Sequence, residues 1–207
     1  MLSINAIFLN IIDWIKKWDT YFFLKINTKL TNPFLDFVYP WYRDSITWVP
    51  FYVFMLAFMI VNFGKRTWHW LWFAVLTILV SDQTSSTLVK GFFARPRPCR
   101  DEVLQFQVRL LLDGCSGGYS FTSSHATNHF AIAMFFSQTL KPFIGKWHQL
   151  FFVWAATIAY GQVYVGVHYP LDIICGGLLG CGIGYLVALL FNKNVGGLQL
   201  RSQIPNL

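Results

Sequence analysis

His168 and Asp172, four residues apart, form the pair in this chain that is best suited to chemistry. At this spacing the carboxylate can accept the N–H of one imidazole nitrogen and fix the tautomer, which leaves the other nitrogen free as a nucleophile or a base. Apolar segments flank the pair, and burying ionisable groups among such segments is costly, so a functional role is the default hypothesis. A structural hydrogen bond would show the same spacing, so other residues must decide between the two interpretations.

A group of basic side chains lies upstream, around two prolines. Lysine and arginine at the end of a spanning helix often extend to lipid headgroups. Four of them together are more typical of a rigid phosphate clamp, because guanidinium groups bind phosphate oxygens through two hydrogen bonds. The four residues are Lys90, Arg95, Arg97 and Arg100.

Ser123, Ser124 and His125 stand at the start of a predicted helix. A helix N-terminus offers free backbone N–H groups and a positive dipole end, which suit an anion, although serines there can also be simple N-caps. His125 and His129 have the spacing of two metal ligands on one helix. No third ligand with suitable spacing stands out, so the sequence predicts no metal site.

The composition of the chain is that of a membrane protein, because 55% of the residues are hydrophobic and only 12% are charged. The formal net charge of +7 would suit either nucleic acid or anionic lipid. The basic residues are not gathered on one soluble helix and no nucleic-acid-binding motif appears. Membrane lipids, and not nucleic acid, are therefore the expected partners.

The apolar runs predict an all-α fold, a polytopic membrane helix bundle with about five spanning helices. The runs cover residues 47–61, 67–90, 121–140, 150–167 and 171–191. Basic residues in the turn 62–66 and the loop 141–148 place these connections on the cytoplasmic side. Lys90, His125 and His168 then share the opposite, extracytoplasmic end of the bundle, which is a usual place for a site in such a fold.

By composition the chain divides into three parts. Residues 1–46 are expected to form interfacial or re-entrant helices, because isoleucines make one apolar stripe up to Lys17 and prolines interrupt the residues that follow. Residues 47–192 are the expected membrane core, and residues 193–207 a cytoplasmic tail.

Cys99 and Cys115 lie in the predicted outer loop and are disulfide candidates. Disulfides persist on an oxidising face of the membrane. Closing a loop of this length would contribute about 3 kcal/mol in the chain-entropy model.

Three short motifs, in this order, resemble the tripartite motif of the type 2 phosphatidic-acid phosphatase superfamily. They are a lysine followed at a distance by Arg-Pro, a Ser-x-His at a helix start, and a histidine with an aspartate four residues on. The resemblance covers about Trp48 to Phe191. The motif residues are Lys90, Arg97, Pro98, Ser123, His125, His168 and Asp172.

The resemblance implies roles for these residues and a reaction that needs no metal or cofactor. His168 would attack the phosphorus and form a phosphohistidine, Asp172 would orient it, and His125 would protonate the leaving oxygen. Such a reaction should show a bell-shaped pH profile and be insensitive to chelators. The phosphate would be held by Lys90, Arg97, Ser123 and Ser124.

The chain departs from the family pattern at two places. Ser124 replaces a glycine, which keeps the backbone N–H. Gly161-Gln162 replaces Ser-Arg, so a neutral amide stands at a phosphate-binding position where the family has a cation. Losing such a contact typically costs a factor of about a hundred or more, and Arg95 or Arg100 could compensate. If the missing cation limits the rate, Gln162→Arg should raise turnover.

The resemblance predicts a multi-pass lipid phosphatase of a bacterial inner membrane with its active site on the extracytoplasmic face. Candidate substrates are undecaprenyl pyrophosphate, phosphatidylglycerol phosphate, phosphatidic acid and the phosphates of lipid A. Two alternatives stay open: a phosphotransferase that passes the phosphoryl group to another lipid, and a binding or transport protein with weak chemistry, which Gln162 keeps in consideration.

Overall fold

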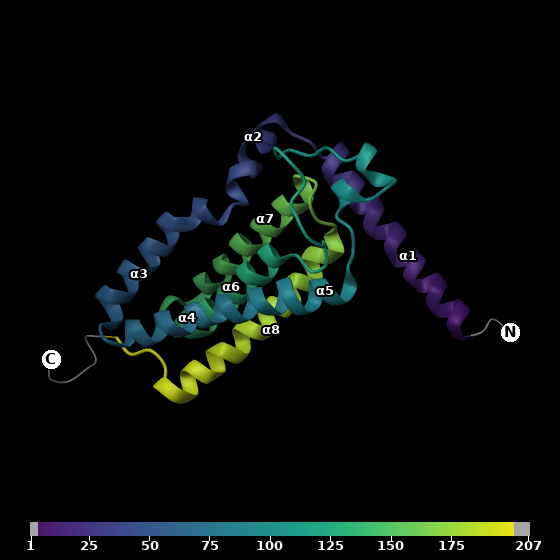
Figure 1. The fold of residues 1–207 in the computed structure, drawn as a ribbon. Helices are drawn as coiled ribbons and strands as arrows, with labels where there is room; N and C mark the ends of the chain where they lie inside the picture. Colours follow the sequence, from purple (N-terminus) through teal and green to yellow (C-terminus); the bar gives the residue numbers. More distant parts are fainter. Residues whose placement is uncertain (1–3, 201–207) are drawn as a thin grey trace.

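The computed structural model describes residues 4–200, all of whose regular structure is helical, in agreement with the predicted all-α class. Residues 1–3 and 201–207 lie outside the described part, so the predicted tail is described only as far as residue 200. Helices α6 (Ser124–Ile144) and α8 (Pro170–Val195) lie together at the centre of a bundle (Figure 1).

Glycines explain why these two helices pack so closely. A Cβ atom at Gly180 or Gly184 of α8 would overlap the carbonyl oxygens of Thr127 and Ala131 of α6. Small residues at such positions let two backbones approach and gain dispersion contacts, as is common between membrane helices. The close packing sets the start of α6 beside the start of α8.

Three further helices complete the bundle. Helix α4 (Arg66–Gln83) continues through a π-helical segment, Thr84–Val89, into α5 (Lys90–Phe93), and packs on both central helices. Helix α7 (Leu150–Tyr164) packs against α6, and α3 (Val49–Phe63) contacts α4. A buried core of mostly aromatic and aliphatic side chains holds these helices together.

Length and hydropathy single out two segments of the described chain as candidate membrane spans, Ser45–Phe63 and Pro170–Val195. Helix α7 has 15 residues, too few for this criterion. Helix α4 carries polar residues near its end: the Ser81 hydroxyl donates to Asn128 Oδ1 of α6 at 2.7 Å. This hydroxyl thus bonds inside the bundle, where lipid cannot reach it, whereas Gln83, Ser86 and Thr87 of the same polar stretch are exposed.

The N-terminal segment is helical from Ile4 onward. Helix α1 (Ile4–Leu24) runs on past Lys17 and projects away from the bundle (Figure 1), because no glycine or proline interrupts it before Pro33. A π-helical turn, Lys25–Lys29, follows. Helix α2 (Pro33–Tyr42) then begins with Asn32 as its N-cap, whose Oδ1 accepts the N–H of Phe34 at 2.8 Å. A short 3₁₀ segment, Ser45–Trp48, leads into α3.

Candidate active site

His168 lies in the short loop between α7 and α8, and only 2% of its surface is exposed. The loop folds back onto the end of α7, since the backbone N–H groups of Val167 and His168 both donate to the carbonyl oxygen of Gln162 at 3.2 Å. Gly166 has a φ of 92°, a conformation that a glycine adopts without strain. The local backbone therefore turns the imidazole into the bundle.

The neighbours of His168 determine which ring nitrogen carries the proton. Arg97 Nη1 lies 3.0 Å from His168 Nε2. A guanidinium can only donate, so Nε2 accepts and the proton of the neutral ring is on Nδ1. The free lone pair of the neutral ring therefore belongs to Nε2.

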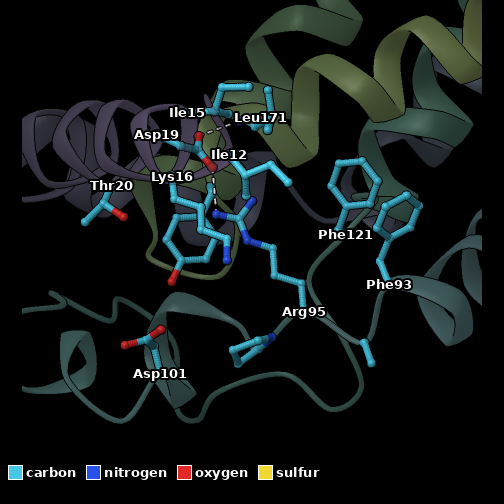
Figure 2. A pocket seen from close by; sticks show the side chains of 13 residues that line it. Ile12, Ile15, Lys16, Asp19, Thr20, Phe93, Arg95, Asp101, Phe121 and Leu171 are labelled. Atoms are coloured by element: carbon cyan, nitrogen blue, oxygen red, sulfur yellow. Dashed lines mark hydrogen bonds and ion pairs between the residues drawn. The ribbon is translucent and has the colours of Figure 1, made fainter. Parts of the chain in front are cut away.

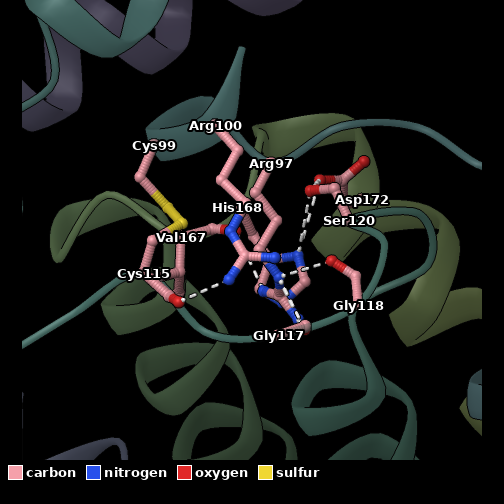
Figure 3. Close-up of a disulfide and its surroundings, with 10 residues drawn as sticks. All are labelled: Arg97, Cys99, Arg100, Cys115, Gly117, Gly118, Ser120, Val167, His168 and Asp172. Atoms are coloured by element: carbon pink, nitrogen blue, oxygen red, sulfur yellow. Dashed lines mark hydrogen bonds and ion pairs between the residues drawn. A yellow bond between two sulfur atoms is a disulfide. The ribbon is translucent and has the colours of Figure 1, made fainter.

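A serine connects the other ring nitrogen to the carboxylate. His168 Nδ1 lies 3.3 Å from Ser120 Oγ and 3.5 Å from Asp172 Oδ2. The Ser120 hydroxyl in turn donates to Asp172 Oδ2 (Figure 3). Because 3.5 Å is long for a direct hydrogen bond, Asp172 orients the ring mainly through Ser120.

Arg97 is held in place by backbone carbonyl groups. Its Nε donates to Gly117 and Gly118 oxygens at 3.3 Å, and Nη1 donates to the Val167 oxygen at 3.1 Å (Figure 3). Burial lowers the pKa of Arg97 to about 10, with the negative charge of Asp172 acting in the opposite direction. The guanidinium therefore stays charged at neutral pH and is available to an anion at His168.

Cys99 and Cys115 form a disulfide with their Cα atoms 5.9 Å apart. The bond joins the segment after Arg97 to the segment before the carbonyl groups that hold it (Figure 3). Arg100 is exposed and its Nη2 donates to the Cys115 oxygen at 3.2 Å. Among the described residues Arg100 thus braces the disulfide loop.

Asp172 is completely buried and is surrounded by donors. Besides Ser120, its Oδ2 accepts the backbone N–H of Tyr169 at 2.9 Å, in a capping box that starts α8. Its Oδ1 accepts Arg95 Nη1 at 2.8 Å. A buried carboxylate with this many partners keeps its charge and has a fixed orientation.

Arg95 is bound between two carboxylates. Its second nitrogen, Nη2, donates to Asp19 of α1 at 2.7 Å (Figure 2). Its guanidinium lies 3.8 Å above the centre of the Tyr169 ring. Asp19 Oδ1 also accepts the backbone N–H of Leu171 at 2.8 Å. The structure therefore gives Arg95 a role in attaching α1 to the start of α8.

A cavity of about 650 Å³ opens beside this network, between α1 and the segment after α5 (Figure 2). Ile12, Ile15 and Phe121 line it with apolar surface. Two cations, Lys16 and Arg95, and two carboxylates, Asp19 and Asp101, lie at the same place. The cavity thus combines an apolar wall with charged groups of both signs, as an amphipathic ligand requires.

The predicted second cluster lies at the start of α6. Ser123 is its N-cap, with Oγ accepting the Ala126 N–H at 3.4 Å, and its own N–H donates to the Asp172 backbone oxygen at 3.1 Å. Ser124 Oγ lies 2.8 Å from Ser86 Oγ. His125 is in the first turn, and its ring makes no hydrogen bond to any residue in 4–200.

The environment keeps His168 neutral. Burial lowers the pKa of His168 to about 4, and the positive charges of Arg97 and Lys90 act in the same direction. Asp172 opposes the shift but does not outweigh burial. At neutral pH the imidazole is therefore unprotonated.

Comparisons with known proteins identify the family. The model of the PAP2 superfamily matches residues 70–195, which is more than half of the chain. The chain belongs to the PAP2 superfamily. The predicted family is therefore confirmed.

Two curated PAP2 relatives are lipid A 4'-phosphatases. That of Bacteroides thetaiotaomicron is 30% identical over 94% of this chain and 86% of its own length. That of Porphyromonas gingivalis is 32% identical over 80% of this chain and 69% of its own length. An undecaprenyl-diphosphatase from Sulfolobus acidocaldarius matches only 37% of the chain, at 39% identity.

Two solved structures share the PAP2 fold. LpxE of Aquifex aeolicus has 25% sequence identity and a TM-score of 0.59, over 83% of this chain and 94% of that protein. A transmembrane PAP2-type phosphatidylglycerolphosphate phosphatase from Bacillus subtilis has a TM-score of 0.65 at 21% identity, over 87% of both chains.

The PAP2 motifs meet at one end of the bundle. Arg97 contacts His168 directly, and Ser123 is joined to Asp172 through the backbone. The Lys90 side chain makes no hydrogen bond or ion pair to another residue in 4–200 but lies near enough for its charge to lower the pKa of His168. Residues 4–200 contain no cluster of three metal-ligating side chains.

Three residues at this PAP2 site lie outside the sequence motifs. Asp19 accepts a hydrogen bond from Arg95, and Ser120 donates one to Asp172. Arg43, at the C-terminus of α2, donates through Nε to Gln162 Oε1 at 3.0 Å. Asp19 and Arg43 are charged residues in a segment rich in aromatic and aliphatic side chains. Charges in such segments are functional candidates by default, and that signal was present in the sequence.

Proposed function

We propose that this protein is an integral-membrane hydrolase that removes phosphate from a lipid by way of a phosphohistidine at His168. One arrangement carries the proposal: Arg97 lies on one imidazole nitrogen of His168, while Ser120 and Asp172 hold the other. This combination supplies a neutral nucleophile, a fixed tautomer and a cation for the phosphate in one place.

The reaction begins when a phosphate monoester reaches His168. Phosphate oxygens are stronger acceptors than the imidazole, so the N–H of Arg97 moves to them and frees the Nε2 lone pair. The Nε2–P bond forms and the P–O ester bond breaks in line, with His125 donating a proton to the leaving oxygen. Asp172, acting through Ser120, stabilises the positive charge that develops on the ring.

The second half of the reaction returns the enzyme to its starting state. His125, now neutral, takes a proton from water, and the water oxygen attacks phosphorus while the P–Nε2 bond breaks. Inorganic phosphate leaves, and His125 is protonated again for the next turnover. Lys90, Arg97 and the start of α6 compensate the charge of the phosphoryl oxygens in both steps.

In the proposed topology α3, the long helix α4–α5, α6, α7 and α8 are the five spans of a core, residues 47–192, in an inner membrane. Residues 1–46 lie at the bilayer surface. The basic turn 62–66 and residues 193–207 are cytoplasmic, and the site opens on the other face. The disulfide supports this orientation, because such bonds persist outside the cytoplasm.

The phosphates of a lipid A-type glycolipid are the first substrate class to test. The match to the lipid A 4'-phosphatase of B. thetaiotaomicron extends over 94% of this chain, whereas the undecaprenyl-diphosphatase match covers 37%. The cavity beside Arg95, with its apolar wall and charged side chains, suits a lipid with a polar headgroup.

Phosphate release in detergent micelles tests the proposal. The unmodified chain and His168→Ala would be compared on lipid A, undecaprenyl pyrophosphate and phosphatidic acid, with His69→Ala, an exposed histidine of α4, as the matched control. Release that is lost only in His168→Ala, together with acid-labile ³²P on the unmodified chain, is expected. No release from any lipid, or transfer to a lipid acceptor without free phosphate, would contradict hydrolysis.

A further inference from the structure

We propose that Arg43 is a phosphate-binding residue of this site, and that Gly161 and Gln162 place it there. The inference rests on the proposed function and adds to it a cation from the N-terminal segment, outside the region that matches the family. Neither Arg95 nor Arg100 fills this role, because each is bound elsewhere: Arg95 between Asp19 and Asp172, and Arg100 at Cys115.

The contact between Arg43 and Gln162 leaves most of the guanidinium available. Arg43 Nε donates to Gln162 Oε1 at 3.0 Å. Its Nη1 and Nη2 make no hydrogen bond or ion pair with any residue between 4 and 200, and the neighbouring Asp44 uses its carboxylate to cap Ile46. Two such nitrogens on one guanidinium can donate a pair of parallel hydrogen bonds to two oxygens of a phosphate.

Gln162 also has an unused donor. Because arginine only donates, the amide oxygen of Gln162 must face Arg43, and the amide nitrogen is directed away from it. That nitrogen is buried and has no partner among the described residues. A buried N–H group without a partner is costly, so an acceptor brought by a ligand would stabilise it.

Arg43 is close enough to the reacting groups for its charge to act on them. Burial is the main cause of the lowered pKa of Arg97, and the positive charge of Arg43 lowers it further. Arg97 in turn touches the imidazole of His168. An anion that binds between these cations would relieve their mutual repulsion.

Gly161 provides the space that brings α2 to this position. A Cβ atom on Gly161 would lie 2.7 Å from Tyr39 Cδ1 and 3.4 Å from Arg43 Cβ. Real side chains do not tolerate the first of these distances, so any larger residue would push α2 away from α7. The Tyr42 hydroxyl lies 2.8 Å from Thr157 Oγ1 and fixes the same helix pair.

The two residues that depart from the family pattern therefore act together. Gly161 admits α2, and Gln162 supplies an acceptor for the arginine that α2 carries. A cation that the pattern places on α7 is supplied by α2 instead.

Four variants in detergent micelles test this role: Arg43→Gln, Arg43→Lys, Gly161→Ala and the exchange Arg43→Gln with Gln162→Arg. Two quantities are measured, kcat/KM for phosphate release from the lipid and the dissociation constant of inorganic phosphate. Arg66→Gln is the matched control. Arg66, the first residue of α4, is also partly exposed, and its guanidinium donates to the backbone oxygen of Gly197.

Arg43→Gln is expected to lower kcat/KM by about a hundredfold and to weaken phosphate binding, with Arg43→Lys and Gly161→Ala in between. The exchange variant is expected to recover at least about tenfold of the loss, because it returns a guanidinium to the site. Arg66→Gln should behave as the unmodified chain.

The outcomes separate the two levels of the proposal. An unmodified chain that releases no phosphate contradicts the proposed function itself. An active chain whose Arg43→Gln variant keeps its turnover overturns the inference about Arg43. Loss of turnover in Arg43→Gln with unchanged phosphate binding also overturns it, because the residue would then only support the fold.

Discussion

Asp19 of α1 and Asp172 of α8 accept hydrogen bonds from the same guanidinium, that of Arg95, at 2.7 and 2.8 Å. Both carboxylates are buried. The cation between them keeps two negative charges close together without strong repulsion. The helix that projects from the bundle is thus linked to the carboxylate beside His168.

Asp19→Asn is expected to lower kcat about tenfold, which corresponds to about 1.4 kcal/mol of transition-state stabilisation. The change leaves Arg95 with one carboxylate and lets it pull Asp172 away from Ser120. Steady-state phosphate release measures the effect. Asp13→Asn, an exposed position on the same helix, serves as the control, and equal kcat values for the two variants would contradict the link.

Asp172→Asn is expected to lower kcat by about 10³- to 10⁴-fold, the size of the loss when an orienting carboxylate of a catalytic histidine becomes an amide. The neutral amide no longer fixes the proton on Nδ1 of His168. Rapid-quench measurement of the phosphorylated enzyme follows the affected step. Asp113→Asn, exposed in the outer loop, should have normal kinetics, and a loss below about tenfold in Asp172→Asn would argue against this role.

Reduction of the disulfide is expected to lower both stability and activity. Opening the Cys99–Cys115 loop should cost about 3 kcal/mol of the free energy of unfolding. It also loosens Gly117 and Gly118, whose oxygens hold Arg97. Thermal unfolding and phosphate release are measured with and without dithiothreitol.

The free cysteines of α8 provide the matched control for this experiment. The double variant of Cys175 and Cys181 to serine should respond to dithiothreitol as the unmodified chain does. The double variant of Cys99 and Cys115 to serine should not respond. Equal activity of the unmodified chain in both conditions would show that the disulfide does not support the site.

His168 should remain neutral at pH values well below the usual pKa of a histidine side chain. Its pKa is lowered to about 4, so the unprotonated ring persists as the pH falls and is lost only when the pH passes through that value. Nitrogen-15 NMR of histidine-labelled protein without substrate measures this directly. The signal is assigned by its absence in His168→Ala, and protonation near pH 6.5 would contradict the prediction.

Gln162→Arg alone is expected to lower phosphatase kcat/KM, in contrast to the rise that a missing cation would suggest. The structure already places Arg43 at Gln162. A second guanidinium there would repel the first and displace α2 from α7. In the Arg43→Gln background the same change should raise kcat/KM. The expected result is therefore that Gln162→Arg changes kcat/KM in opposite directions in the two backgrounds.

Much of the site could be predicted from the sequence because its parts are short motifs. The spacing of His168 and Asp172, the Arg97-Pro98 pair and the start of α6 each follow from local chemistry. Glycines in an apolar run are likewise a local sign of close helix packing, and Gly180 and Gly184 of α8 provide it. Local patterns of this kind need no knowledge of how distant segments pair.

The remaining contacts depend on tertiary packing. Arg43 is 119 residues from Gln162 along the chain, and Asp19 is 76 residues from Arg95. No spacing rule connects residues so far apart. Ser120 lies three residues before the Ser-x-His motif, but its position between His168 and Asp172 follows from the fold of the loop before α6.

The region that matches the family begins at residue 70, after both Asp19 and Arg43. A chimera that joined this region to the N-terminal helices of another protein would therefore inherit His168 and Asp172 without two of the charges that surround them. The N-terminal helices and the core must then be exchanged together if this set of charges is to stay complete.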